Sequence, residues 1–241
     1  LVISSLTMGR IHKIVYKKLM MYYIFMNILA VDSSHKDLSL SLKIEDMITT
    51  KIYQKDGKHS EIFLEAINDI LKKSNIQSSN LSGILFNKGP ASFTGTRVAA
   101  SSLQAIGYSL DIPIIGISSL EVMAYMHIID SDMNKFTCAK YAYGSKYFTA
   151  SFEKSDKLSQ IKDTLLADID IINIPHDEHL VINNELSEYL QKNNLYIPSN
   201  YTTLSRETNS EDLIFFSEKY INLGDKFNLR DTLPDYANHE I

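Results

Sequence analysis

Two short apolar runs, residues 83–87 and 114–117, enclose a helical pattern at 94–110, and this order constrains the fold more than any other feature. A helix between two strands carries the chain back to the edge where it started, so the two strands become parallel neighbours in one sheet. Residues 28–31 form another continuous apolar run, which is typical of a strand buried on both faces. The sequence therefore predicts an α/β fold with a partly parallel central sheet.

Two further strands and a helix are predicted beside the first strand. After a polar turn at 33–37, apolar residues alternate with polar ones over 38–44, which predicts a strand with one face in solvent. Residues 47–53 return antiparallel to it. A helix follows at 59–73, where apolar residues recur four apart in two adjacent stripes, Ile62, Ala66, Ile70 and Phe63, Ile67, Leu71.

The second half is less regular, and we expect it to form a second subdomain. A soft boundary lies near 126–134, where Asp130-Ser131-Asp132 interrupts the apolar flow, so residues 27–130 and 131–241 are predicted as two related subdomains. The expected elements are a hairpin at 136–141 and 146–152, a helix at 158–166, a strand at 179–182, a helix at 185–192, a loop over 193–209 and a final helix at 210–223.

Residues 1–25 are set apart from the fold in this interpretation. Residues 10–26 read as a basic stretch followed by an apolar one, a pattern also found in signal peptides and short anchors. The apolar run is too short to span a membrane and continues into the strand at 28–31. We expect a loose or non-native extension ahead of a natural start at Met26.

Charge and cysteine content limit the function classes. The net charge of −5 gives no broad attraction to phosphate backbones, which disfavours an autonomous RNA-binding module. The single cysteine, Cys138, excludes an internal disulfide, and its apolar surroundings predict a small buried side chain rather than a nucleophile. We expect a cytoplasmic protein without a membrane segment.

The first candidate site follows the strand at 28–31. Asp32 ends that strand and is followed by Ser33 and Ser34, and the carboxyl ends of strands are where α/β sheets expose functional groups. A carboxylate there can hold a hydrated metal, while hydroxyls and amides can meet phosphate oxygens. The alternative is an Asp that caps its own turn.

The second candidate site is the run NKGPASFTGTR at residues 87–97. Gly89 and Gly95 allow backbone conformations closed to other residues, Pro90 stiffens the turn, and Ser92 or Thr94 can cap the helix. The run lacks the Lys-Ser/Thr ending of a Walker loop, so that mechanism is excluded. We interpret it as resembling a phosphate loop.

The helix at 94–110 carries two stripes of different size. Ala99, Leu103, Ile106 and Leu110 suit a sheet, whereas the neighbouring small stripe would let another helix approach closely; it comprises Val98, Ser102, Ala105 and Ser109. That second helix belongs either to a partner or to this chain, at 59–73.

Residues 27–121 resemble the TsaB (YeaZ) family. The resemblance rests on NILAVDSS, the HSE that opens a helix, ILFNKGPASFTGTR and IPIIGISSLE. Within the family's GPGSFTGLR-like run, Ala91 and Thr96 depart, and the matching residues are Gly89, Pro90, Ser92, Phe93, Thr94, Gly95 and Arg97. Ala91 stiffens the loop and weakens a phosphate grip. Beyond residue 125 the resemblance is thinner and rests on the 143–147 hairpin and on 229–231.

The resemblance implies an actin/Hsp70-like ATPase (ASKHA) fold and a non-catalytic subunit for making threonylcarbamoyladenosine beside the anticodon of tRNA. The implied partners are the catalytic subunit TsaD, as a heterodimer, and TsaE, with tRNA reached only through the complex and self-pairing when the chain is alone. The implied interface is the helix pair 59–73 and 94–110, with Ile62 and Ala66 beside the small stripe. No cofactor of its own is implied, beyond ATP or ADP held weakly or shared at the complex interface.

The catalytic relative binds its metal through two histidines of a His-Leu-Glu-Gly-His-like run. The matching positions here are Ser119 and Met123, and neither an alcohol nor a thioether makes a good site for a hard divalent ion. The resemblance therefore predicts that this chain has no catalytic metal and is not an enzyme.

Two enzymatic alternatives stay open. One is an ATP-dependent small-molecule kinase or ATPase of the same fold, with Asp32 holding a metal nucleotide and residues 89–95 touching phosphate. The other is a metalloprotease-like enzyme, against which Ser119 and Met123 argue. His176 and His179 have a chelating spacing, but their polar context predicts a solvated loop, and His59 has no role beyond matching the family.

Overall fold

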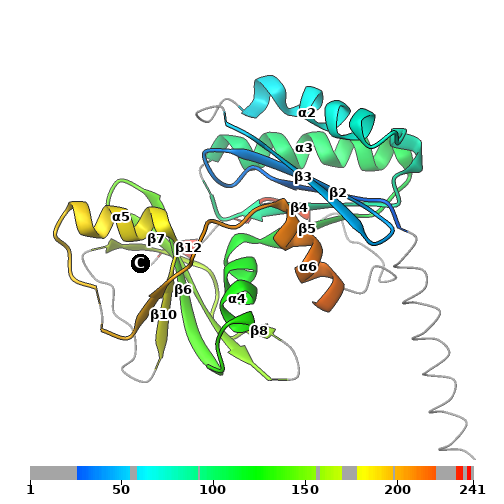
Figure 1. Ribbon diagram of the computed structural model, residues 1–241. Helices are drawn as coiled ribbons and strands as arrows, with labels where there is room; N and C mark the ends of the chain where they lie inside the picture. Colours follow the sequence, from blue (N-terminus) through cyan, green and yellow to red (C-terminus); the bar gives the residue numbers. More distant parts are fainter. Residues whose placement is uncertain are drawn as a thin grey trace, which may run out of the picture.

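The computed structural model describes residues 26–54, 59–91, 93–155, 158–169, 178–197, 199–220, 232–235 and 238–239. Figure 1 shows two sheets with α4 and α6 between them, α2 and α3 on the outer side of one sheet and α5 on the outer side of the other. Sheet A has five strands in the order β3-β2-β1-β4-β5. Its strands are β1 (Ile28–Asp32), β2 (Leu38–Ile44), β3 (Met47–Tyr53), β4 (Gly83–Gly89) and β5 (Ile114–Ser118).

Sheet A combines the predicted meander and the predicted parallel strands. β1 pairs antiparallel with β2, and β1, β4 and β5 run parallel, as the helical returns require. Two helices, α2 (His59–Lys73) and α3 (Phe93–Leu110), pack their apolar stripes on one face, above a core that includes Leu29, Phe63 and Leu103. A short 3-10 helix, η1 (Ser78–Asn80), precedes β4.

Sheet B has seven strands, with β11-β10-β6-β7-β9-β12 in order and β8 paired with β7. The helix α5 (Asn184–Lys192) packs on its outer face through Leu186 and Leu190. The strands are β6 (Lys135–Tyr143), β7 (Lys146–Lys154), β8 (Leu158–Gln160), β9 (Leu165–Asp168), β10 (His179–Ile182), β11 (Tyr201–Thr203) and β12 (Asn238–His239).

The inner faces of both sheets share one core with α4 (Ser119–Ile129) and α6 (Ser210–Tyr220). Ile28 and Leu85 enter it from sheet A, and Phe136 and Phe152 from sheet B. Since both sheets bury apolar side chains in the same core, their relative position is fixed by packing.

The two sheets repeat one topology. In sheet A, β3-β2-β1 form an antiparallel meander and β4 and β5 extend it in parallel; in sheet B, β9-β7-β6 and then β10 and β11 do the same. The predicted actin/Hsp70-like fold with two mixed sheets is confirmed by this arrangement. The chain changes sheets between α4 and β6, but α6 returns to pack on β1 and β2. The division into 27–130 and 131–241 as separate units therefore stays a prediction.

The prediction that β2 has one face in solvent is wrong. Ser39, Ser41 and Lys43 are buried because α6 covers that face. The polar side chains are satisfied there: Ser210 N–H donates to Ser39 Oγ at 2.8 Å, and Lys43 forms an ion pair with Glu218. The polar residues that alternate along β2 therefore face polar groups of α6 and not solvent.

Three other elements differ from the sequence predictions. The helix predicted at 158–166 is wrong, since β8 and β9 occupy this segment. The predicted loop at 193–209 contains the short strand β11. The helix α4 was not predicted, because eight of its eleven residues are buried and it has no polar face to reveal a period.

Several predictions fall outside the described residues, namely those on residues 1–25, Ser92, His176 and 229–231. Among the helices that the structure describes, none has the length and apolar character needed to cross a bilayer.

Candidate functional site

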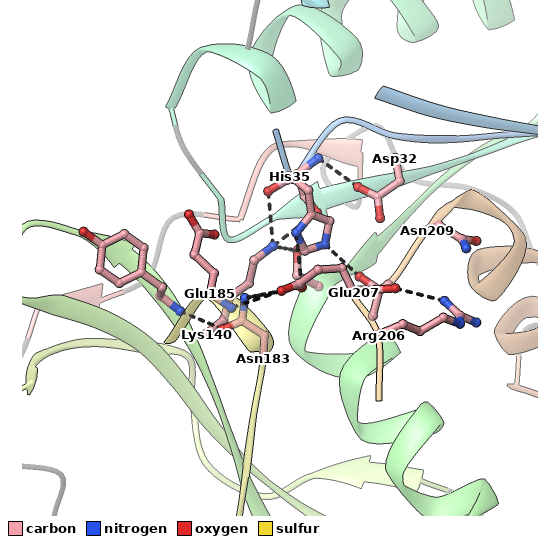
Figure 2. A network of polar contacts seen from close by, with 12 residues as sticks. Asp32, His35, Lys140, Asn183, Glu185, Arg206, Glu207 and Asn209 are labelled. Carbon is pink, nitrogen blue, oxygen red and sulfur yellow. Dashed lines mark hydrogen bonds and ion pairs between the residues drawn. The ribbon is translucent and has the colours of Figure 1, made fainter. Parts of the chain in front are cut away.

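A network of buried polar side chains lies in the packed interior where the two sheets meet, a region that we refer to as the cleft. We call it the cleft network and define it as Asp32, Ser34, Asn87, Ser119 and Lys140. Figure 2 shows Asp32 and Lys140 approaching from opposite sides, Asp32 from sheet A and Lys140 from sheet B. The side chains of Asp32 and Lys140 are only 1% and 2% exposed, so each charge needs partners within the protein.

Asp32 uses both carboxylate oxygens within its own half. Oδ1 accepts a hydrogen bond from Ser34 N–H at 2.8 Å, and Oδ2 accepts one from Asn87 Nδ2 at 3.1 Å. The first bond is the turn-capping contact that was the alternative to a ligand role. The structure therefore shows the capping role, with Asn87 as an additional partner.

Asn87 organises the end of β4. Its Oδ1 accepts from Gly89 N–H at 3.0 Å and from Ser119 Oγ at 2.7 Å, and its Nδ2 also donates to Ser34 Oγ at 3.0 Å. Gly89 adopts a φ of 97°, the left-handed region that favours glycine. One amide side chain thus joins the ends of β1, β4 and β5, a role that the sequence did not predict for it.

Lys140 is the cation of the network. Its Nζ donates to Ser34 O at 3.3 Å, Ser34 Oγ at 3.2 Å and Ser119 Oγ at 3.5 Å. Burial lowers the pKa of Lys140, whereas the charges of Asp32, Glu207 and Glu185 raise it. Sequence reasoning missed this residue, although a lysine within a predicted apolar strand was a signal that could have found it.

His35, Glu185 and Glu207 extend the network toward sheet B (Figure 2). His35 contacts Thr208 Oγ1 at 2.9 Å through Nε2 and Glu207 at 3.4 Å through Nδ1. Burial, and then Lys140, lower the pKa of His35 to about 3, so the ring is neutral. Glu207 also accepts from Glu185 N–H at 3.2 Å and from Asn183 Nδ2 at 3.3 Å.

The segment 232–235 contacts both the loop that resembles a phosphate loop and the helix α3 that follows it. Asp235 N–H donates to Lys88 O at 2.8 Å, and Gln104 Nε2 donates to Thr232 Oγ1 at 2.9 Å. Burial raises the pKa of the Asp235 carboxyl and of the Glu121 carboxyl. The nearby charge of Lys88 lowers both pKa values, but by less than burial raises them. Asp235 and Glu121 are half-buried, so two acids and Lys88 lie beside this end of the loop.

The residues at this cleft do not fit a magnesium nucleotide, the ligand that an actin/Hsp70-like ATPase fold implies. Both carboxylate oxygens of Asp32 accept hydrogen bonds, and the Lys140 ammonium lies within 3.5 Å of three oxygens that a metal ion in its place would need. Ser92 lies outside the described residues, and nothing is described of the Thr94 side chain. Gly95 and Pro90 take part in no described contact with the cleft network.

The two positions that the family resemblance equates with metal-binding histidines lie in the interior. The Ser119 hydroxyl donates to Asn87, and Met123 packs in the shared core at 1% exposure. Across the part of the chain that the structure describes, no three His, Cys, Asp or Glu side chains are grouped to hold a metal. Cys138 is buried, as predicted, and burial raises the pKa of its thiol well above the usual value.

The predicted partner face lies on the outer side of α2 and α3, away from the cleft (Figure 1). Ala105 and Ser109 are exposed, and Val98 and Ser102 are half-buried. Ile62 and Ala66 are instead buried in the chain's own core, which corrects their assignment to an accessible interface. The small stripe therefore does not pack fully against α2, and part of it is left to solvent.

Large apolar side chains accompany the exposed end of the small stripe. Tyr108 on α3 is 90% exposed and Leu64 on α2 is 64% exposed. A shallow groove of about 510 Å³ runs along α2 toward η1, lined in part by Leu64, Ile67 and Lys72. We call the solvent-facing side of these two helices the helix surface, defined by Leu64, Asn68, Ser101, Ala105, Tyr108 and Ser109.

Comparison with known proteins gives relatives of two kinds. Residues 54–165 match the family described as "TsaD: tRNA N6-adenosine threonylcarbamoyltransferase". The tRNA threonylcarbamoyladenosine biosynthesis protein TsaB of Bacillus subtilis is 36% identical over 100 residues, which is 41% of this chain and 44% of that protein. TsaB of Buchnera aphidicola subsp. Acyrthosiphon pisum is 35% identical over 97 residues, 40% of this chain and 44% of that protein.

The structural likeness extends further along the chain than the sequence match. A solved structure of YeaZ from Pseudomonas aeruginosa superposes with a TM-score of 0.72 at 19% identity, covering 88% of this chain and 99% of that chain. The alignments with curated TsaB proteins span less than half of their length. The resemblance to TsaB (YeaZ) that the sequence motifs predicted is confirmed, and the fold is similar to that of YeaZ over 88% of the chain.

Proposed function

From this likeness to TsaB, we propose that the chain is a cytoplasmic, non-catalytic subunit in the biosynthesis of threonylcarbamoyladenosine in tRNA. It binds a TsaD catalytic subunit through the helix surface, TsaE joins the complex, and tRNA is contacted only through the complex. The observation that carries this proposal is the exposed part of the small stripe, with Ala105 and Ser109 beside the 90% exposed Tyr108.

The helix surface has the chemistry of a helix-docking site. Small side chains at Ala105 and Ser109 let a second helix approach closely, and Tyr108 supplies a large contact area at its edge. Burial of such an aromatic anchor is the usual source of interface affinity. Binding here would stabilise the conformation that the partner adopts in the complex. Such a population shift requires no active site on this chain.

The residues of the cleft network support the proposal that this chain is not the catalytic subunit. The residues aligned with metal ligands are a hydrogen-bonded serine and a core methionine, and the network around Asp32 is closed by protein groups. We propose that any ATP or ADP in the complex is held mainly by the partner. No cofactor is assigned to this chain.

Co-purification of the full chain with TsaD tests the interface. Ala105→Lys places a charge at the centre of the helix surface and should weaken association at least about tenfold. Gln191→Lys, on the exposed side of α5, is the matched control and should bind like wild type. Retention of wild-type stoichiometry by Ala105→Lys would show that the partner binds elsewhere.

Ser102→Arg is a second probe on the same stripe. Because Ser102 is half-buried, this variant also requires a melting curve, whereas Ala105 is exposed and should leave the fold intact. Sedimentation of the isolated chain tests self-pairing through the same surface. If two copies pair there, Ala105→Lys should shift the dimer to monomer and Gln191→Lys should not.

The alternative function is an ATP-dependent kinase or ATPase of the same fold. Calorimetric titration of the purified chain with ATP and magnesium separates the two. We expect no submicromolar binding, because Lys140 and the hydrogen-bonded Asp32 leave no place for the metal. Tight, magnesium-dependent binding would favour the alternative.

A further inference from the structure

The repeated topology places Asp32 and Lys140 at equivalent positions of the two halves. In sheet A, Asp32 follows Val31, which pairs with Phe86 of β4. In sheet B, Lys140 follows Ala139, which pairs with Ile182 of β10. The next residue of the parallel partner is an asparagine in both halves, Asn87 and Asn183. An acid and a base thus stand at matching points on the two sides of the cleft.

The surroundings of the Lys140 ammonium are those of a bound cation. Three oxygen atoms lie within 3.5 Å of Nζ, the carbonyl and hydroxyl of Ser34 and the hydroxyl of Ser119. The carboxylates of Asp32, Glu185 and Glu207 add negative potential around it (Figure 2). Oxygen atoms backed by carboxylates are the ligands that hard divalent cations select.

Neutral His35 does not supply the balancing charge. Its pKa of about 3 keeps the ring uncharged, and it contacts Glu207 and Thr208 as a hydrogen-bonding group. Arg206 is engaged by Asp212, which it contacts with two nitrogens at 2.8 and 2.6 Å. Lys140 is therefore the buried cation beside Asp32, Glu185 and Glu207, of which only Asp32 is fully buried, and Lys36 is a second cation that acts on Glu185.

We propose that Lys140 is a built-in cation that takes the place of a metal ion in the cleft between the two sheets. The lysine comes from sheet B, and its oxygen partners come from the end of β1 and the start of α4. It joins the two halves without a ligand and excludes a hydrated divalent cation. Removing the ammonium group turns the same oxygens into a divalent-cation site. This proposal does not depend on the proposed function.

The test uses Mn²⁺ as the probe, with its free concentration followed by electron paramagnetic resonance, and thermal melting of the same samples. Lys140→Ala removes the charge and opens space for a hydrated ion. It should bind about one Mn²⁺ per chain at millimolar concentration, whereas wild type should bind none at this site. Its melting temperature should fall by roughly 10 °C without Mn²⁺ and recover by about 3 °C or more with it.

Two further variants identify the cause. Asp32→Asn combined with Lys140→Ala removes both charges, and it should neither bind Mn²⁺ nor lose as much stability as the two single changes added together. Lys154→Ala is the matched control, because Lys154 on β7 also donates to backbone carbonyls, those of Ile128 and Ser131, at 3.4 and 3.3 Å. It should show no Mn²⁺ dependence.

The proposal is overturned if wild type binds Mn²⁺ as tightly as Lys140→Ala, or if Lys140→Ala melts like wild type and binds no Mn²⁺. If Lys140→Ala does not fold, Lys140→Met fills the volume of the lysine stem and the comparison moves to Lys140→Met with and without Asp32→Asn. Folding of the double variant but not of the single one supports charge balance. Failure of both shows that Lys140 acts through packing, and the proposal falls.

Discussion

In sheet A the outer face is covered by α2 and α3, of 15 and 18 residues, whereas the described outer helix of sheet B is α5, of 9 residues. The strand orders beneath them are equivalent. The exposed positions also differ: α2 and α3 expose the large apolar side chains of Leu64 and Tyr108 beside charged residues such as Glu65 and Lys72, while α5 exposes Glu188, Gln191 and Lys192. One topology therefore carries two different outer surfaces, and that of sheet A is the one that we propose for a helical partner.

The inner faces of the two sheets do not differ in this way, because they pack together into one core. Both sheets contribute to the shared core, and α6, which follows β11 of sheet B, packs on β1 and β2. Lys140 adds a polar link across the cleft. The outer faces thus differ between the halves, while the inner faces act together.

The largest test of this contrast is Phe136→Ala in the shared core. Phe136 is fully buried, with its ring 4.9 Å from that of His127 and 6.1 Å from that of Phe152. Removing it should lower the free energy of unfolding by about 4 kcal/mol. Because both sheets use this core, urea denaturation should remain a single transition by circular dichroism and by fluorescence. Two separate transitions would show that the halves unfold independently.

The next effect concerns pH and the edge of the same core. His127 is buried, its Nε2 has no hydrogen-bond partner, and its ring stacks on His179 at 5.5 Å. Burial, and then His179, lower its pKa to about 4. In the unfolded chain this histidine is protonated below about pH 6.5, whereas in the folded chain it is protonated only below about pH 4. The free energy of unfolding therefore falls as the pH decreases from 6.5 to 4.

His127→Phe removes that titration. Its free energy of unfolding should fall less steeply than that of wild type between pH 6.5 and 4 in parallel urea titrations. His35, with a pKa of about 3, remains in both proteins and so cancels in the comparison. Parallel curves for the two proteins would contradict the assignment to His127.

A smaller effect sharpens the difference between the outer layers. A Cβ at Gly107 of α3 would lie 2.4 Å from Cγ1 and Cδ1 of Ile114 in β5. Gly107→Ala gains roughly 1 kcal/mol of helix propensity but overpacks the contact by ~1–3 kcal/mol. We expect a net loss of about 1 kcal/mol, measured as a lower urea midpoint. A gain in stability would mean that α3 is held more loosely on its sheet.

The smallest effect is expected in the β6–β7 hairpin. Gly144 has a φ of 57°, and nothing lies within 4 Å of the position that a Cβ would occupy there. Gly144→Asn should change stability by less than about 0.5 kcal/mol, since asparagine tolerates the left-handed region, and Gly144→Val should cost about 1–2 kcal/mol. Equal midpoints for the two variants would show that backbone conformation does not select glycine at this turn.

Much of the fold was predictable because its signals are local. The buried strands β1, β4 and β5 are short apolar runs bounded by turns, and α2 and α3 show clear helical periods. The helix α4 and the strands β8 and β9 were missed or misassigned. A helix that is buried on nearly all sides has no contrasting face, and strands of three or four residues owe their conformation to the pairing with β7.

For the candidate site, the sequence by itself determined where Asp32 and the loop at 89–95 would lie and that the Ser119 and Met123 positions lack metal-binding histidines. Only the tertiary structure decided that Ser39 and Ser41 are buried, that Ile62 and Ala66 belong to the core, and that Lys140 stands opposite Asp32. Local pattern fixes which residues share a face of an element. Which element covers that face, and which charge meets another across more than 100 residues of chain, is settled by packing.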